Sequence, residues 1–329
     1  MNAPICRTGA VCADPHHSSR PLSSPHRPPH RVSLSLLVIL GVTACLLSTG
    51  WATESFVPGK IHPRLTDPNL KELSGAASSQ SHPSFLWALN DSGNSPALYL
   101  MDDLGRSRGQ VLVTGAPNID WEDLAGFDLE GRPYLLIADT GDNAARRKIC
   151  SLHVVPEPDT EPGRVGGTIH PAWTIPVRYE DGPRDCEAVA VDARAGEIFL
   201  ISKRTWPQVL YGLPLRPMPS EAPVVARRRG IVNLPKADPW EGPYASQSTG
   251  LDFNPQGDLA AVLTYARVFL FHRRPGETWP QAFARKPERL RRHGLEQAEA
   301  LAFSSDGQSI HVLSEGAGSP VVIYKKRDQ

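Results

Sequence analysis

Short apolar runs recur along the chain from residue 72 to residue 326, and polar loops separate them. Runs of about five to eight residues that are rich in branched and aromatic side chains, with turn residues between them, predict β-strands. The five clearest runs read FLWALN (85–90), YLLIAD (134–139), EIFLIS (197–202), LAAVLT (259–264) and SIHVLS (309–314). Turns at Glu130-Gly131, Ala195-Gly196, Gln256-Gly257 and Asp306-Gly307 precede four of them. These turns predict hairpins, because glycine adopts a positive φ at little cost.

Each of these runs is followed by another, which makes the pattern a repeat. The following runs read ALYLM (97–101), ICSLHVV (149–155), VLYGLPL (209–215), VFLFH (268–272) and VVIYK (321–325). Weaker outer strands are predicted at QVLVT (110–114), TIHPAWTIPV (168–177), VVARRRGIV (224–232) and 282–290. The units begin at Glu72, Glu122, Glu187, Thr249 and Glu299, between 50 and 65 residues apart.

A repeat of this length with four strands per unit is typical of a β-propeller. We therefore predict an all-β fold, a five-bladed β-propeller over residues 53–329. The segment FVPGKIHPRL (56–65) is expected to supply the outer strand of the last blade, which closes the ring and removes open sheet edges. The alternative is a six-bladed ring with its sixth blade hidden in 216–247.

Residues 1–52 have a different pattern and predict an export signal or membrane anchor. A Pro/His/Ser-rich lead with four Arg precedes an uncharged stretch that contains SLSLLVILGVTACLL. A basic lead, an apolar run and small residues before a cleavage point, here after Ala52, are typical of a signal peptide. Two alternatives are lipidation at Cys45 and an uncleaved anchor, for which about 20 apolar residues suffice. Each predicts an extracytoplasmic protein, periplasmic or secreted, with membrane contact only through this segment.

Composition excludes some classes of function. The 35 Lys+Arg balance 35 Asp+Glu, so the chain lacks the positive charge with which nucleic-acid binders neutralise phosphates. Expected partners are a small molecule or an extracellular partner, with the chain a monomer. Cys150 and Cys186 are the two cysteines outside the lead. They either form one disulfide or are small buried apolar side chains.

Acidic residues recur where the units begin and in the loops that follow their second strands. In a blade these two places lie at the same end, so the side chains are expected to converge on the central axis. Carboxylate and amide oxygens are suitable Ca²⁺ ligands. The predicted metal-site residues are Glu72, Glu122, Asp139, Asp142, Asn143, Glu187 and Glu299. The alternative is that each Glu accepts backbone N–H groups and that the loops NDSG and DTGDN are Asx-turns.

Further side chains are expected at the mouth of the channel, namely Asn90, Asp91, Trp121, Asp185, Lys203, Arg204 and Tyr265. Lys203 and Arg204 either bind an anionic group or pair with the nearby Glu residues. Trp121 is either a stacking platform or a packing residue. The sequence has no GxSxG, HExxH or P-loop motif.

The motifs ELSG–LWALNDSGN, DWEDLAG, LIADTGDN and DGPRDCEAVAVD resemble extracytoplasmic bacterial propellers related to the SdiA-regulated and NHL-like families. More distantly, the chain is similar to gluconolactonase-, regucalcin- and phytase-like propellers. The resemblance covers about 72–326 and implies a calcium site near the axis. By match to the motifs, its residues are Glu122, Asp139, Asp142, Asn143 and Glu187. Thr249 departs from the pattern, because the other units begin with Glu.

These observations predict a calcium-binding propeller that binds a ligand or partner at its axial mouth. One alternative is a calcium-dependent hydrolase of an ester, lactone or phosphoester, in which the ion polarises a substrate oxygen or lowers the pKa of a bound water. A second alternative is an interaction scaffold without a metal. The histidines of the body do not fall in the loops expected at the mouth, which favours binding over hydrolysis.

Overall fold

The computed structural model describes residues 54–59, 63–161 and 165–327 of the 329-residue chain. The chain divides into two units, 1–50 and 51–329, and every described residue belongs to the second. The predicted export segment and Cys45 therefore lie outside the described residues. No helix within the described ranges combines the length and the apolar character needed to cross a membrane.

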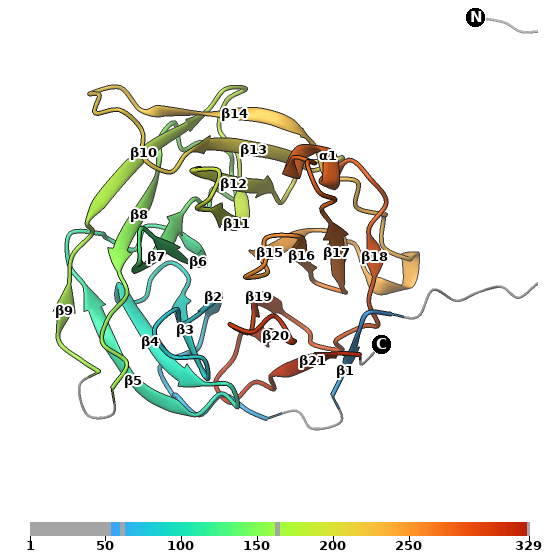
Figure 1. Cartoon of the computed structure of the whole chain (residues 1–329), viewed down its shortest axis with the longest axis horizontal. Coiled ribbons are helices and arrows are strands. Elements are labelled where there is room, and N and C mark those ends of the chain that lie inside the picture. The colour runs from blue at the N-terminus through green and yellow to red at the C-terminus, as the bar shows by residue number, and fades with distance from the viewer. Residues whose placement is uncertain (1–53, 60–62, 162–164, 328–329) are drawn as a thin grey trace, which may run out of the picture. The chain divides into compact units, whose positions relative to one another are not determined.

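Almost all of the regular secondary structure in the described chain is β-strand, and the strands are arranged around a common centre (Figure 1). The first sheet has the strand order β2-β3-β4-β5-β9. Its strands are β2 (Leu73–Ser78), β3 (Phe85–Asn90), β4 (Ala97–Asp102), β5 (Ser107–Val113) and β9 (Thr168–Ile169). The sheet is antiparallel except at its outer edge, where β9 pairs parallel to β5.

The second sheet has eight strands and consists of two antiparallel halves. One half is β6 (Trp121–Leu129), β7 (Arg132–Asp139), β8 (Cys150–Pro156) and β10 (Trp173–Tyr179). The other half is β11 (Cys186–Asp192), β12 (Glu197–Ser202), β13 (Val209–Pro214) and β14 (Val224–Ile231). Their outer strands β10 and β14 pair in parallel, so the two halves are continuous at the rim.

Two four-stranded sheets complete the arrangement. The third contains β15 (Ser248–Phe253), β16 (Leu259–Thr264), β17 (Val268–His272) and β18 (Glu288–Arg289). The fourth contains β19 (Ala298–Phe303), β20 (Ser309–Ser314), β21 (Val322–Lys326) and β1 (Phe56–Pro58). A 3-10 helix, η1 (Pro239–Glu241), precedes β15, and the short helix α1 (Trp279–Phe283) lies between β17 and β18.

The fourth sheet joins the two ends of the described chain. β1 pairs antiparallel with β21, with Phe56 opposite Lys326 and Pro58 opposite Tyr324. This confirms the prediction that the segment beginning at Phe56 supplies an outer strand to the last unit. The innermost strands β2, β6, β11, β15 and β19 contact one another in a closed cycle (Figure 1).

The second strands of the units were predicted closely, and the outermost strands less well. β3, β12, β16, β17 and β20 have the predicted bounds. The prediction of one strand over 168–177 is wrong, because β9 belongs to the first sheet and β10 to the second. Within 282–290 only 288–289 form a strand, since helix α1 covers the beginning of that stretch. Residues 216–247 contain one strand and η1, which leaves no four-stranded unit in this stretch for a sixth blade.

Hydrophobic side chains fill the space between neighbouring sheets. The second strand of each unit is largely apolar on both faces, because both faces pack against another sheet. β3 and β16 illustrate this, with five and six fully buried residues. Five buried clusters hold the units together, one between each adjacent pair. This packing fixes the inner strand ends on which the candidate site is built.

Candidate functional site

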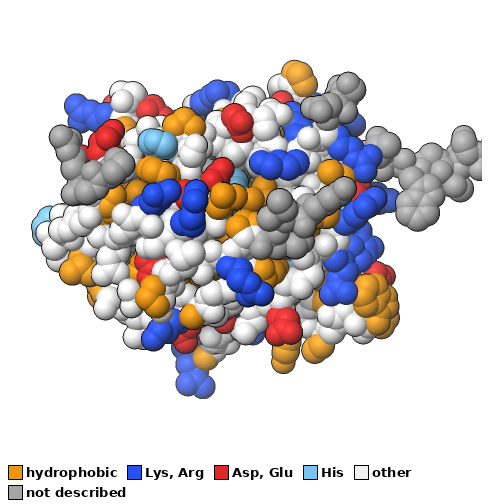
Figure 2. Space-filling view, turned by 90° about the horizontal axis from the view of Figure 1, so that it is seen from below, with side chains coloured by type: hydrophobic (Ala, Val, Ile, Leu, Met, Phe, Trp, Pro, Cys, Tyr) orange, Lys and Arg blue, Asp and Glu red, His pale blue; other side chains and the backbone are white. Residues whose placement is uncertain are grey.

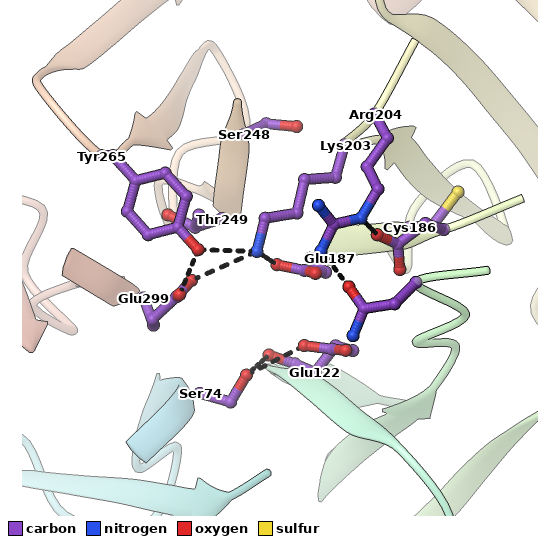
Figure 3. A network of polar contacts seen from close by, with 12 residues as sticks. Ser74, Glu122, Cys186, Glu187, Lys203, Arg204, Ser248, Thr249, Tyr265 and Glu299 are labelled. Atoms are coloured by element: carbon purple, nitrogen blue, oxygen red, sulfur yellow. Dashed lines mark hydrogen bonds and ion pairs between the residues drawn. The ribbon is translucent and has the colours of Figure 1, made fainter. Parts of the chain in front are cut away.

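A β-bulge recurs near the beginning of every innermost strand. The register with the second strand shifts across one unpaired residue in each, and these residues are Ser74, Glu122, Glu187, Thr249 and Glu299. A bulge turns a side chain away from the regular alternation of the strand. Its repetition therefore brings five polar side chains to the centre, three of them carboxylic acids (Figure 3).

Glu72 does not belong to this set. Its side chain is exposed, and its Oε2 accepts a hydrogen bond from Asn94 Nδ2 at 2.6 Å. The bulged residue of the first unit is Ser74, whose hydroxyl donates to the backbone oxygen of Glu122 at 2.7 Å and to its Oε2 at 3.2 Å. Glu72 therefore lies two positions before the residue that aligns with Glu122, Glu187 and Glu299. The sequence contains a signal for the correct alignment, because Ser74-Gly75 matches Thr249-Gly250.

Lys203 places a buried ammonium group among the central carboxylates (Figure 3). The lysine follows β12, and only 5% of its side chain is exposed. Its Nζ forms an ion pair with Glu187 Oε2, lies 3.9 Å from Glu299 Oε2 and donates to the Tyr265 hydroxyl at 2.8 Å. Tyr265 in turn donates to Glu299 Oε1 at 2.6 Å. Of the two roles open to Lys203, the structure supports pairing with Glu.

Burial raises the pKa values of these glutamates above that of an exposed glutamic acid. The pKa of Glu187 rises to about 8 and that of Glu299 to about 7, in each case because burial outweighs the attraction of Lys203. The pKa of Glu122 rises well above its usual value through burial and through repulsion by Glu187. Burial alone would lower the pKa of Lys203, but Glu187 and Glu299 outweigh it and raise the pKa, so the ammonium stays charged.

Glu122 is shared by two groups of three carboxylates. One group is Asp91, Asp120 and Glu122, and the other is Glu122, Asp185 and Glu187. In each, one oxygen from every residue lies within 4.8 Å of the others. We call the group of Asp91, Asp120 and Glu122 the outer triad, and the group of Glu122, Asp185 and Glu187 the inner triad. Oxygens at ~2.3–2.6 Å from one Ca²⁺ ion lie within about 5 Å of one another, so either spacing suits a single ion.

The two triads differ in how far protein cations already neutralise them. In the inner triad, Glu187 pairs with Lys203, and Asp185 Oδ2 accepts from Arg204 Nε at 2.6 Å. In the outer triad, none of the three carboxylates forms an ion pair with a Lys or Arg of the described chain. The outer triad therefore fits a divalent cation better than the inner one.

The pKa values of the outer triad agree with its lack of cationic partners. The pKa of Asp120 rises to about 6 through burial and through repulsion by Asp91. Burial also raises the pKa of Asp91. Each group therefore exchanges protons at a higher pH than a free carboxylic acid, and a bound cation would favour the ionised forms.

Gly141 lets the backbone approach these carboxylates closely. A Cβ atom at this position would overlap Glu122 Oε1 and lie 2.5 Å from Asp120 Oδ2. The Gly141 N–H donates to the Asp120 carbonyl at 3.1 Å. Gly141 was not predicted as a site residue, although it lies between Asp139 and Asp142, which were.

The other residues of DTGDN belong to neither triad and organise their loop. Asp139 Oδ1 pairs with Arg147 at 2.8 Å and accepts the Asp120 N–H at 3.1 Å. Asp142 accepts the N–H groups of Arg146 and Arg147 at 2.8 and 2.7 Å. Such bonds are the turn-type alternative that the sequence left open.

Asn143 and Asn90 also have polar partners in or beside the loops. Asn143 Oδ1 accepts from Arg204, and Asn90 Oδ1 accepts the Glu72 N–H at 3.2 Å while its Nδ2 donates to the Asn69 carbonyl at 2.7 Å. Trp121 is fully buried and packs in a cluster with Trp87, so it is a packing residue. Cys150 and Cys186 are buried free thiols.

Comparison with known proteins does not assign the chain to a family. No family model matches the chain, and no curated protein matches it. Among solved structures, the chain is similar to the crystal structure of a nidogen/laminin complex, with 13% identity, a TM-score of 0.42, and coverage of 74% of this chain and 73% of that chain. At this level of similarity, the description of the fold depends on the strand order and register given above.

Proposed function

We propose that this chain is a five-bladed β-propeller that binds Ca²⁺ at the outer triad of Asp91, Asp120 and Glu122. The cation would lie at the mouth of the channel and either stabilise the ring or help to hold a ligand there. The blade count is supported by the five bulged inner strands and their closed cycle of contacts. The export-type pattern of residues 1–52 supports a role outside the cytoplasm.

One observation carries the proposal, namely the position of Glu122. Its side chain is buried, it is common to both triads, and Ser74 is the one hydrogen-bond donor to its carboxylate within the described chain. Buried carboxylates ordinarily have a cationic partner or coordinate a metal. Lys203 serves Glu187 and Glu299, which leaves Glu122 for an external cation.

The net charge of the mouth points the same way. The two triads and Glu299 provide six carboxyl groups, and among the described residues two cations, Lys203 and Arg204, pair with members of this set. If every group were ionised, four negative charges would remain. An acidic concavity of this kind attracts cations and repels anions. Ca²⁺ suits it better than Mg²⁺, because Ca²⁺ accepts irregular sets of oxygen ligands.

The test is a thermal unfolding experiment on the full chain with either Ca²⁺ or a chelator. We expect Ca²⁺ to raise the melting temperature of the wild type and to leave Glu122→Gln unchanged. Glu72→Gln is the matched control, because it removes an exposed carboxylate of the same mouth and is expected to respond to Ca²⁺ as the wild type does. A wild type that does not respond to Ca²⁺, or a Glu122→Gln variant that still responds fully, would contradict the proposal.

Hydrolysis remains the alternative and has less support. Both triads consist of carboxylates, and none of the described histidines is a member of either one. The two carboxylates that are not proposed ligands, Asp185 and Glu187, already pair with Arg204 and Lys203. Turnover of a lactone or an aryl phosphate by the wild type, lost in Glu122→Gln and kept in Glu72→Gln, would establish the alternative.

A further inference from the structure

A second concave site lies beside the axial mouth. It is a cavity of about 790 Å³, within the usual size range for small-molecule sites. Its walls come from the loops that precede β15 and β19. Tyr265 and Arg204, which bond to Glu299 and Asp185, also line it. Arg292 and Tyr244 also line it, and sequence reasoning assigned neither residue.

The Arg292 guanidinium stacks on an aromatic ring and has one acidic neighbour. Its Cζ lies 4.9 Å from the ring centroid of Trp240, and its Nε lies 3.5 Å from Glu241 Oε1. No other ion pair or hydrogen bond of its guanidinium occurs within the described chain. Stacking on an aromatic ring orients the planar group and leaves its outer N–H donors available for a carboxylate or phosphate.

Glu241 neutralises Arg292 only in part, because other arginines share the same carboxylate. Arg267 Nη2 lies 2.8 Å from Glu241 Oε1, and Arg289 Nη2 pairs with Asp238 Oδ2 at 2.8 Å. The three arginines of this cluster therefore exceed its two acids by one positive charge. Burial lowers the pKa of Arg267, and repulsion by Arg289 lowers it further, as an excess of positive charge would.

The surface around the cavity has the same character. Lys and Arg side chains gather at the edge of the molecule that carries β1 and β18 in Figure 1, as Figure 2 shows. Two large aromatic side chains are exposed nearby, with Trp240 at 66% and Tyr244 at 61% of their full surface. Exposed aromatic rings beside a guanidinium that is only partly neutralised suit a ligand with a flat apolar body and an anionic group.

We propose that this cavity binds a small organic anion, with its carboxylate, phosphate or sulfonate on Arg292 and its apolar body against Tyr244. This site is distinct from the outer triad, because it uses a cationic side chain and residues from other loops. The two sites have opposite charge preferences and can be tested separately.

The experiment is a fluorescence titration of the full chain with 1-anilinonaphthalene-8-sulfonate, an aromatic sulfonate that fluoresces when bound. N-phenyl-1-naphthylamine has the same rings without the charge and serves as the matched probe. We expect one saturable site for the sulfonate in the wild type. Arg292→Gln should weaken that binding at least tenfold while changing the affinity for the neutral probe less than threefold.

Two control variants separate the site from general effects. Arg274→Gln removes an exposed arginine from the turn after β17, which does not line the cavity, and should bind both probes as the wild type does. Lys286→Gln, which removes another exposed cation outside the lining of the cavity, should also leave both affinities unchanged. Unsaturable binding, or equal losses in Arg292→Gln and Arg274→Gln, would overturn the proposal.

A further variant keeps the proposal testable if Arg292→Gln does not fold. Tyr244→Ala truncates a side chain that is 61% exposed, so the fold should tolerate it. Its melting temperature should match that of the wild type, and it should bind both probes more weakly, because each loses the same apolar contact. Unchanged affinity for both probes would contradict the proposed position of the ligand.

Discussion

Replacing Lys203 with methionine removes the one ammonium group in the central cluster and keeps a side chain of similar length. Glu187 and Glu299 then lose their cationic partner while both remain buried, with 4% and 8% of their side chains exposed. The Tyr265 hydroxyl loses an interaction of 2.8 Å with Lys203. We expect a large loss of stability at neutral pH.

The magnitude follows from the distances. Two unit charges 3.9 Å apart, as for Lys203 Nζ and Glu299 Oε2, attract by about 4 kcal/mol at an effective dielectric constant of 20. The methionine removes this attraction but also the cost of burying the ammonium group. Breaking a buried pair by removing one partner ordinarily costs ~3–5 kcal/mol, and we expect Lys203→Met to lie in that range.

Urea unfolding of the full chain at several pH values measures this effect. Without Lys203 the pKa values of both glutamates rise further in the folded state. Between the ordinary glutamate pKa and these raised values, the folded state binds more protons than the unfolded state, so stability falls as the pH rises. The deficit of Lys203→Met relative to the wild type should therefore be smallest near pH 5 and grow toward pH 8.

Two variants serve as controls. Lys286→Met removes an exposed lysine and should change stability by less than about 0.5 kcal/mol. In the double variant Lys203→Met/Glu187→Gln, one uncompensated charge is gone, and we expect about half of the loss to be recovered. A Lys203→Met protein as stable as the wild type at pH 8, or a deficit that does not depend on pH, would refute the reasoning.

Three further predictions concern the same axis. The wild type itself should lose stability as the pH rises from about 5 to 8, because burial raises the pKa of Glu299 to about 7 and that of Glu187 to about 8; Glu299→Gln should reduce this slope in urea unfolding. Gly141→Ala should cost about 1–3 kcal/mol and abolish the Ca²⁺-induced rise in melting temperature, because its Cβ would displace the two carboxylates beside it. Asp123→Ala should cost about 2–5 kcal/mol in urea unfolding, because this buried carboxylate accepts backbone N–H groups from three inner strands, at 2.8, 2.7 and 3.3 Å; a loss below 1 kcal/mol would contradict it.

Much of the fold could be predicted from the sequence because the inner strands are short, apolar and bounded by glycine turns. Glu130 and Gly131 illustrate the reason, since both adopt a positive φ at the hairpin between β6 and β7. Outer strands were harder to predict because their pairing is decided at the rim. Within 168–177, the residues around Pro171 leave one sheet and enter another, and no periodicity in the sequence marks that change.

The site was predictable in composition but less so in geometry. The sequence indicated that Glu122, Glu187 and Glu299 meet near one axis, and the bulges place them there. It misassigned the first unit, because an acidic residue was taken as the marker when the bulge was the recurring feature. Ser74 occupies the bulge, and Glu72 lies outside it.

The central ammonium group could be assigned only from the structure. Nothing local in the sequence shows that Lys203 reaches Glu187 and Glu299, because the three residues come from different strands and loops. The partners of the predicted metal residues Asp139 and Asp142 could likewise be assigned only from the structure. Their hydrogen bonds depend on the conformation of the whole DTGDN segment, not on the residue types alone.

Calorimetric titration of the full chain with Ca²⁺ tests the central claim most directly. Because burial and repulsion by Asp91 raise the pKa of Asp120 to about 6, Ca²⁺ binding at the outer triad should displace protons from Asp120 near that pH. Repeating the titration in buffers of different ionisation enthalpy measures that number. We predict one Ca²⁺ per chain, with proton release that is clear at pH 6 and smaller at pH 8, and no binding by Glu122→Gln. Binding without proton release, or binding that survives Glu122→Gln, would contradict the account.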